Sequence, residues 1–351
     1  MELENSSAAR HLGSCFRGVN VSEEYKEHLA SPWFATTFGL IGLFSNLFAL
    51  CALVNSSRKM QSPSGSSFLV FLCGLVVTDF LGLLLTFVIV IPYHFLRFDW
   101  MEVDPGCHLC NFLGFVMVFF GQCPLLLGAT MAGERFVGIN RPFSRSAGIS
   151  KRRAWTLVGM VWALGFFFGL LPFFGLGNYS LQYPNSWCFL TLVHDARNVV
   201  FCFLFALLGL LSVGLSFLFN TVSVVTLCRV YHDSESVQRR RDSEVEMMVQ
   251  LLMIMVIASV CWLPLLVSPQ VLPPSDFPSN QIPRETERFL LIYLRVATWN
   301  QILDPWVYIL FRRAVLRRIY PSFRPRPSIV SLYPVLNPSL RKKFTQESVL
   351  Q

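Results

Sequence analysis

The chain contains about seven apolar runs, each long enough to cross a lipid bilayer as a helix. They lie near residues 33–54, 68–92, 108–139, 154–176, 199–229, 247–272 and 289–311. Each supplies the roughly 20 predominantly apolar residues that a helix needs to span the hydrocarbon core of a membrane. A large soluble core would instead require helices with one polar face, and these runs have none. The sequence therefore predicts an all-α membrane protein, a bundle of seven transmembrane helices.

Composition and charge agree with this fold and predict its orientation. Of the 351 residues, 53% are hydrophobic and 14% are charged, and the net charge is +8. Lys and Arg concentrate in the loops on one side and in the C-terminal tail, which places the N-terminus outside the cell and the tail inside. The positive charge then reflects membrane topology, so a nucleic-acid partner is not needed to explain it. Because no apolar signal segment precedes the first run, we expect the first helix to act as its own signal anchor.

The sequence divides into four segments. They are an extracellular N-terminal segment (1–32), a seven-transmembrane domain (33–311), a short amphipathic helix (312–320) and a cytoplasmic tail (321–351). The amphipathic segment alternates apolar residues with arginines, as expected of an eighth helix on the membrane surface in contact with lipids. The tail is rich in Pro, Ser and Arg, which is typical of a disordered segment.

Four of the ten cysteines lie on the predicted outer side, where oxidation is permitted. Four cysteines allow three pairings, and Cys107 and Cys110 are so near in sequence that joining them would constrain nothing distant. We expect Cys110–Cys188 to tether the long loop before the fifth run, and Cys15–Cys107 to hold the N-terminal segment. The outer side also carries three Asn-X-Ser sequons that predict N-glycosylation, at Asn5, Asn20 and Asn178.

Polar residues inside the apolar runs are candidates for function, because each is costly in a membrane. Those that stand out are Asn46, Asp79 and Asp304 in the inner half of three runs, Glu134 and Arg135 at the inner end of the third run, and Trp262 beside Pro264 in the sixth. The first three could share a polar pocket that holds a proton or a cation. The proline next to the tryptophan provides a point at which a helix can pivot.

Arg295 lies near the outer end of the seventh run. Asp304 is about 13 Å away along the helix axis, so the two cannot pair. No acidic residue lies in the outer half of another run, and Met117, at the inward-facing position of the third run, is apolar. A guanidinium in these surroundings favours an anionic ligand, because a carboxylate fits its planar fork with two hydrogen bonds. Its other expected neighbours, Phe115, Leu291, Thr298 and Trp262, are mostly apolar, so Arg295 predicts a site for a fatty-acid derivative. The alternative is that Arg295 extends to the membrane interface.

Several short motifs occur in order along the whole chain. They are Asn46, Leu75-x-x-x-Asp79, Glu134-Arg135-Phe136, Trp162, Cys261-Trp262-Leu-Pro264 and Asp304-Pro305-Trp-Val-Tyr308. Together they resemble the rhodopsin-like (class A) G-protein-coupled receptors, and Leu294-Arg295 with Asp304-Pro-Trp resemble the prostanoid receptor branch. The resemblance implies a prostanoid lipid ligand, a heterotrimeric G protein of the Gq class as partner, a rise in intracellular calcium and a location in the plasma membrane. It implies neither a cofactor nor a metal.

The resemblance also implies roles for individual residues. The ligand pocket would contain Arg295, His94, Trp187, Thr191, Ser186, Met117, Leu291, Thr298 and Trp262. Activation and G-protein coupling would involve Asp79, Asn46, Glu134, Arg135, Trp262, Asp304, Pro305 and Tyr308. The chain departs from the wider family in having no proline or tyrosine within 199–229 and in having Pro124 where many relatives place a serine beside a sodium ion.

Two other classes of protein fit the sequence less well. An enzyme would need paired acids and bases or metal ligands, and the six histidines are scattered without paired spacing. A transporter would be expected to show internal repeats with broken helices at matching positions, and neither is apparent. Among receptors, the main alternative is another prostanoid subtype, one that binds a prostaglandin.

Overall fold

A computed structural model describes residues 15–16, 32–57, 63–96, 98–140, 149–191, 195–232, 238–268 and 284–310. The chain separates into two units, Met1–Ile309 and Leu310–Gln351. The fold described below is that of the first unit. The predicted surface helix 312–320, the tail and the sequons at Asn5 and Asn20 lie outside the described residues.

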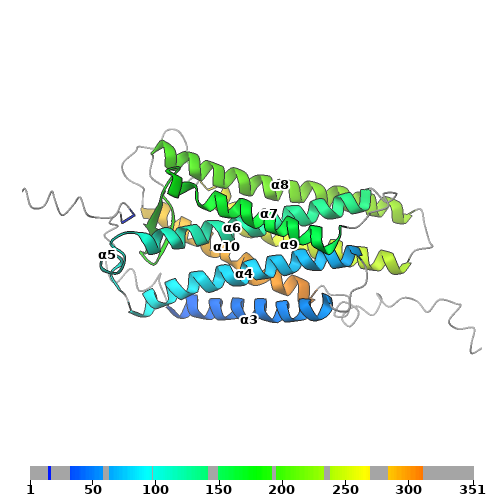
Figure 1. Cartoon of the computed structure of the whole chain (residues 1–351), viewed down its shortest axis with the longest axis horizontal. Helices are drawn as coiled ribbons and strands as arrows, with labels where there is room; N and C mark the ends of the chain where they lie inside the picture. Colours follow the sequence, from blue (N-terminus) through cyan, green and yellow to red (C-terminus); the bar gives the residue numbers. More distant parts are fainter. Residues whose placement is uncertain are drawn as a thin grey trace, which may run out of the picture. The chain divides into compact units, whose positions relative to one another are not determined.

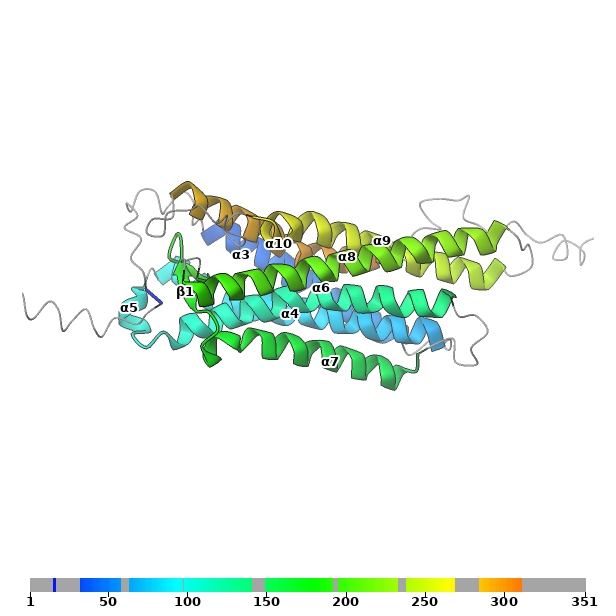
Figure 2. The ribbon, with the colours of Figure 1, turned by 90° about the horizontal axis from the view of Figure 1, so that it is seen from above.

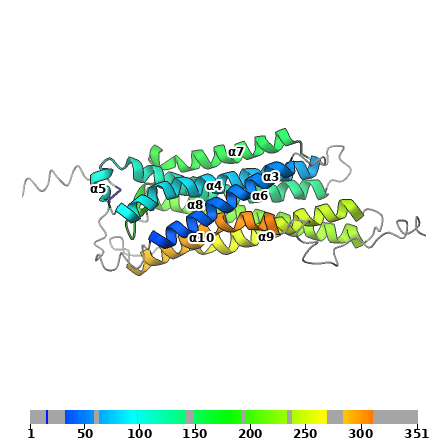
Figure 3. The ribbon, with the colours of Figure 1, turned by 90° about the horizontal axis from the view of Figure 1, so that it is seen from below.

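Seven long helices form the described part of the first unit. They are α3 (Pro32–Ser57), α4 (Pro63–Leu96), α6 (His108–Asn140), α7 (Lys151–Gly169), α8 (Ala196–His232), α9 (Gln238–Leu266) and α10 (Arg284–Leu310). Figures 1, 2 and 3 show them lying side by side along one direction. The helix α6 is central, since it packs against α4, α7, α8 and α9. The predicted seven-helix bundle is confirmed.

Five of the described helices are long and apolar enough on their own to cross a membrane, namely α3, α4, α6, α8 and α9. The helix α7 has 19 residues and begins with three basic ones, and α10 contains Arg295 and Asp304. The fourth helix ends earlier than the apolar run predicts. Its end at Gly169 is followed by the 3-10 helix η1 (Leu171–Phe174), which has a proline in its first turn. Gly175 caps η1, and its φ of 88° suits a residue without a side chain.

A short hairpin lies at the outer end of the bundle. Its strands β1 (Tyr179–Gln182) and β2 (Trp187–Leu190) pair antiparallel, with Tyr179 opposite Leu190. The hydroxyl of Tyr179 donates to the carbonyl of Gly169 at 2.7 Å, and burial raises the pKa of this tyrosine, so the hydroxyl keeps its proton. A side chain at Gly114 of α6 would clash with the tyrosine ring, because its Cβ would lie 2.5 Å from the ring. The hairpin is therefore packed directly onto α6.

Both predicted disulfides are present. Cys110, in the first turn of α6, is bonded to Cys188 of β2, and Cys15 is bonded to Cys107. The backbone N–H of Leu181 in β1 also donates to the carbonyl of Cys15 at 3.0 Å. The two disulfides and this hydrogen bond attach both the hairpin and a point near the N-terminus to the start of α6.

Asp104 organises the segment that carries these cysteines. It follows the short helix α5 (Trp100–Val103), and its carboxylate accepts from the backbone N–H groups of His108 at 2.8 Å and Cys110 at 2.9 Å. These N–H groups have no partner inside the helix, and a negative charge is favoured at a helix N-terminus. Asp104 thus caps α6 at the point where both disulfides are attached.

Candidate functional site

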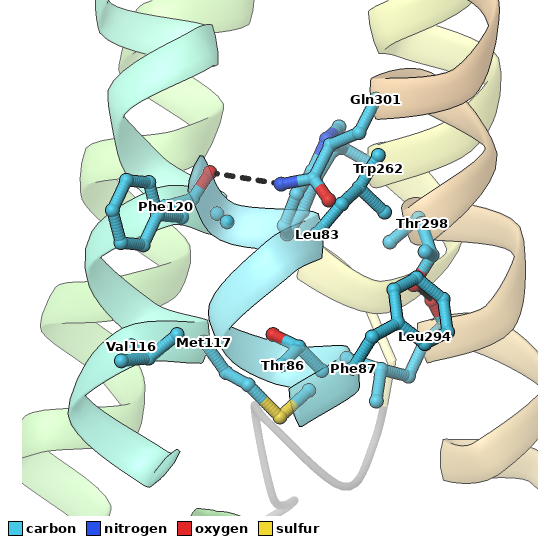
Figure 4. A pocket seen from close by; sticks show the side chains of 13 residues that line it. Leu83, Thr86, Phe87, Val116, Met117, Phe120, Trp262, Leu294, Thr298 and Gln301 are labelled. Carbon is cyan, nitrogen blue, oxygen red and sulfur yellow. Dashed lines mark hydrogen bonds between the residues drawn. The ribbon is translucent and has the colours of Figure 1, made fainter. Parts of the chain in front are cut away.

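A cavity with two adjoining chambers lies among α3, α4, α6, α9 and α10. The outer chamber has a volume of about 140 Å³ and the inner one about 60 Å³. They share five lining residues, which are Thr86, Phe87, Met117, Leu294 and Thr298. Figure 4 shows the inner chamber with α6 on one side and α10 on the other. The cavity therefore extends from the hairpin inward between the helices.

Arg295 lines the outer chamber, with its side chain half-buried. His94 of α4 lines the same chamber and lies near Arg295. Ser186 and Trp187 contribute from the hairpin, and the indole N–H of Trp187 donates to the carbonyl of Tyr183 at 3.0 Å. The outer chamber thus combines basic groups with a tryptophan whose ring is fixed by a hydrogen bond.

The inner chamber is mainly apolar. Met117, Phe120 and Trp262 line it, and Trp262 is only 4% exposed. Within the described part of the chain, the indole N–H of Trp262 has no hydrogen-bond partner. The tryptophan lies directly on α6 at Gly121, where an added Cβ would be 2.7 Å from the ring. Any group that fills this chamber must therefore contact the Trp262 ring.

The structure brings eight of the nine predicted ligand residues to the cavity. The outer chamber contains Arg295, His94, Ser186, Trp187, Leu291, Met117 and Thr298, and the inner one adds Trp262. Thr191 lines neither chamber. It is buried, its backbone N–H donates to the carbonyl of Asn178 at 2.9 Å, and its own carbonyl accepts from the Cys202 thiol.

Several lining residues escaped the sequence reasoning. They are Thr86 and Phe87 of α4, Phe38 of α3 and Trp299 and Gln301 of α10. The α10 members could have been found, because Leu291, Leu294, Thr298 and Gln301 recur at helical spacing on the face that carries Arg295. Those of α3 and α4 belong to helices that are apolar all round, so no pattern indicates which face meets the cavity.

A buried polar cluster lies at the inner end of the cavity. The side-chain amide of Asn46 donates to the carbonyls of Gly42 and Gln301, each at 2.9 Å. Asp79 is fully buried and interacts electrostatically with Asp304, whose carboxylate accepts from the Asn300 amide at 3.0 Å. Both carboxylate oxygens of Asp79 lack a hydrogen-bond partner among the described residues. The three polar residues predicted to share a pocket, Asn46, Asp79 and Asp304, are all buried here.

The C-terminal end of α6 is closed by a second polar group. The guanidinium of Arg135 donates to the neighbouring carboxylate of Glu134 at 2.5 and 2.6 Å. The hydroxyl of Ser67 in α4 donates to the same carboxylate at 3.0 Å, and Met247 of α9 lies 3.6 Å from the guanidinium. Arg135 is 2% exposed, so α4 and α9 cover it. Another protein could reach this arginine only after the helices that cover it move.

Comparisons with known proteins agree with this geometry. The profile of the family described as "7 transmembrane receptor (rhodopsin family)" matches residues 45–308. The chain is 61% identical to the thromboxane A2 receptor of Bos taurus over 333 residues, covering 93% of the chain and 97% of that protein. It is 60% identical to the thromboxane A2 receptor of Homo sapiens, covering 97% of the chain and 98% of that protein.

More distant matches show the same pattern. The prostaglandin F2-alpha receptor of Homo sapiens is 37% identical over 296 residues, covering 84% of the chain and 81% of that protein. The crystal structure of squid rhodopsin superposes with a TM-score of 0.69 at 18% identity, covering 90% of the chain and 91% of that structure. This last likeness concerns the fold alone.

Proposed function

Because the chain belongs to the rhodopsin family of seven-transmembrane receptors and is a multi-pass membrane protein of the prostanoid receptor group, we propose that it is a plasma-membrane receptor for thromboxane. Its N-terminus lies outside the cell. Binding of the lipid activates a heterotrimeric G protein, of the Gq class in the first place, and raises intracellular calcium. The second candidate ligand is a prostaglandin, in line with the 37% identity to the prostaglandin F2-alpha receptor.

The observation that carries this proposal is the position of Arg295 in an otherwise mostly apolar cavity. Thromboxane and the prostaglandins are fatty-acid derivatives with a carboxylate at one end and an apolar chain. A guanidinium binds a carboxylate with two parallel hydrogen bonds, and it does so most strongly away from water. The carboxylate would therefore lie at Arg295 in the outer chamber, near His94 and Ser186. The apolar part of the ligand would extend past Met117 toward Trp262.

The cytoplasmic contacts support a resting conformation. Arg135 is held by Glu134 and covered by Met247 of α9. Pro264 lies within α9 two residues after Trp262, and a proline removes one helical hydrogen bond and allows a bend there. Pressure of the ligand on Trp262 would then be transmitted along α9 and uncover Arg135 for the G protein.

Ligand displacement on membranes from cells that express the chain tests the proposal. A labelled thromboxane analogue should bind, and unlabelled thromboxane analogues should displace it at lower concentrations than prostaglandins F2-alpha, E2 and D2. The methyl ester of the analogue should bind much more weakly than the acid. Calcium release in the same cells, blocked by removal of the Gq class of α-subunits, tests the coupling. Stronger displacement by a prostaglandin would favour the second candidate, and the absence of binding by all of them would exclude a prostanoid receptor.

A further inference from the structure

Gln301 of α10 lies where two proline-containing helices meet. Its side-chain amide nitrogen donates to the backbone carbonyl of Phe120 in α6 at 3.3 Å, a contact visible in Figure 4. Its own backbone carbonyl accepts from the amide of Asn46 in α3 at 2.9 Å. One residue thereby connects three helices at the inner end of the cavity.

The backbone carbonyls of Phe120 and Gln301 each lack their usual hydrogen-bond donor within the helix, because that donor position is a proline. In an α-helix the carbonyl of residue i accepts from the N–H of residue i+4. The residue four positions after Phe120 is Pro124, and the residue four positions after Gln301 is Pro305. Proline has no N–H, so each of these carbonyls loses its usual partner inside the helix. In a membrane such a group is satisfied by a neighbouring helix, a nearby polar side chain, an ordered water or a local adjustment of the helix, and here two side-chain amides from other helices reach the carbonyls.

The packing around the amide leaves it little freedom. Gly82 of α4 lies against this contact, and a Cβ there would be 2.8 Å from Phe120 Cβ and 3.1 Å from the Gln301 amide nitrogen. Pro124 and Phe120 are buried. Gln301 and Phe120 also line the inner chamber, together with Trp262. The bond that satisfies the α6 carbonyl is therefore also part of the cavity wall.

We propose that Gln301 is a positioning residue for the binding cavity, whose amide replaces the hydrogen bond that Pro124 removes from α6. The bond holds α10 against α6 and fixes the spacing of the two walls of the inner chamber. Asn46 does the same for the carbonyl that Pro305 frees, so the polar cluster and the cavity are attached to the same residue. Gln301 and Pro124 thus form one unit although they lie on different helices.

A double-mutant cycle with Gln301→Leu and Pro124→Ala tests this unit. In the unliganded, detergent-purified full-length protein, Gln301→Leu should lower the thermal midpoint by on the order of 5 °C, because it leaves a buried carbonyl without a donor. Alanine at position 124 restores the N–H to the Phe120 carbonyl. In the Pro124→Ala background, Gln301→Leu should therefore lower the thermal midpoint by less than half as much. An equal loss in both backgrounds would overturn the proposal. This measurement needs no ligand, so its result is independent of the proposed function.

Gln122 provides a matched control on α6. It is a buried glutamine whose amide also donates to a backbone carbonyl on another helix, that of Phe205 in α8 at 3.0 Å. The residue four positions after Phe205 is Gly209, which keeps its N–H. Gln122→Leu should lower the thermal midpoint by the same amount with and without Pro124→Ala. Equal rescue of Gln122→Leu and Gln301→Leu would show that Pro124→Ala merely stabilises α6 and would overturn the pairing.

Ligand affinity separates positioning from direct contact. For a labelled thromboxane analogue, Gln301→Leu should lower the affinity roughly tenfold in the wild-type background, and the affinity should recover in the Pro124→Ala background. A loss that persists there would mean that Gln301 itself binds the ligand, and the positioning role would be wrong. If Gln301→Leu alone does not reach the cell surface, the double variant with Pro124→Ala should reach it. If the Pro124→Ala single variant is found at the surface and the double variant is not, the proposal is overturned.

Discussion

At the scale of single residues, Arg295 determines what chemistry the cavity can accept. Arg295→Leu keeps α10 apolar, so the protein should insert and reach the surface. It should nevertheless lose most binding of a carboxylate ligand, because breaking one side of a desolvated charge pair costs about 2–5 kcal/mol, or roughly 30-fold to several thousand-fold in affinity. Arg295→Lys keeps the charge but loses the planar fork, so its affinity for the carboxylate should lie between those of the wild type and Arg295→Leu.

The ester of the same ligand is the control for this substitution. Affinities of the acid and the ester are measured on the wild type and on Arg295→Leu at matched surface expression. On Arg295→Leu, the ester should lose far less affinity than the acid, because its contact with the guanidinium is already weak. Equal losses for acid and ester would mean that Arg295 stabilises the bundle and does not recognise the carboxylate.

Gly121 fixes the position of Trp262 at the same scale. Gly121→Ala would place a methyl group 2.7 Å from the indole ring that lines the inner chamber, so the ring or α6 must shift. We expect agonist affinity to fall roughly tenfold, which corresponds to about 1.4 kcal/mol. Gly128→Ala on the same helix is the matched control, because nothing lies within 4 Å of its added Cβ. Radioligand binding on both variants decides the matter; similar affinities for the two would show that the ring tolerates the displacement.

At the scale of elements, the hairpin depends on its attachment to α6. Cys188→Ala breaks the bond to Cys110, and Trp187, next to it in β2, lines the outer chamber. Ligand binding at the cell surface should be abolished, because the strand that carries Trp187 is no longer held over the cavity. Cys228→Ala removes a free, exposed cysteine of α8 and should leave binding unchanged. Saturation binding on intact cells measures both, and normal affinity in Cys188→Ala would contradict the structural role.

The elements also show where sequence reasoning succeeds and where it stops. The seven helices could be predicted because a membrane requires apolar runs of fixed length. The hairpin could not, because its strands have four residues each and β2 is buried on both faces, so no alternation of polar and apolar residues marks it. The fourth helix was predicted too long, since the apolar run continues through η1 past the end of the helix.

The residues of the cavity also differ in whether the sequence alone can predict them. Arg295 stands out in the sequence because a charge in an apolar run needs an explanation. Gln301 does not, since its importance depends on the relative register of α6 and α10, which brings it to the carbonyl freed by Pro124. The family resemblance implies Thr191 as a pocket residue, in the loop around Cys188, and this is wrong for the cavity described here. In the structure it follows β2 and packs instead beside Cys202 of α8. β2 ends at Leu190, so Thr191 lies beyond the strand that carries Trp187 to the cavity.

At the scale of the whole molecule, the cavity and the Glu134–Arg135 pair lie toward opposite ends of the bundle, with the polar cluster between them. Asp79→Asn removes a carboxyl group from that cluster without changing any residue that lines the cavity. We expect agonist-stimulated calcium release to fall at least several-fold while antagonist affinity stays within about twofold, because coupling between sites is carried by the intervening packed groups. Both are measured at matched surface expression. A loss confined to affinity, with full maximal signalling, would contradict this division.

The unequal polarity of the cavity has a consequence for synthetic compounds. Its outer chamber carries Arg295 and His94, whereas its inner chamber is lined mainly by apolar side chains. A competitor therefore needs no lipid skeleton: an acidic group joined by a spacer of suitable length to a rigid aromatic body satisfies both ends. A body too short to reach Trp262 would occupy the site without pressing on that ring. Such compounds should block the receptor, and extending them inward by one ring should convert some blockers into partial agonists.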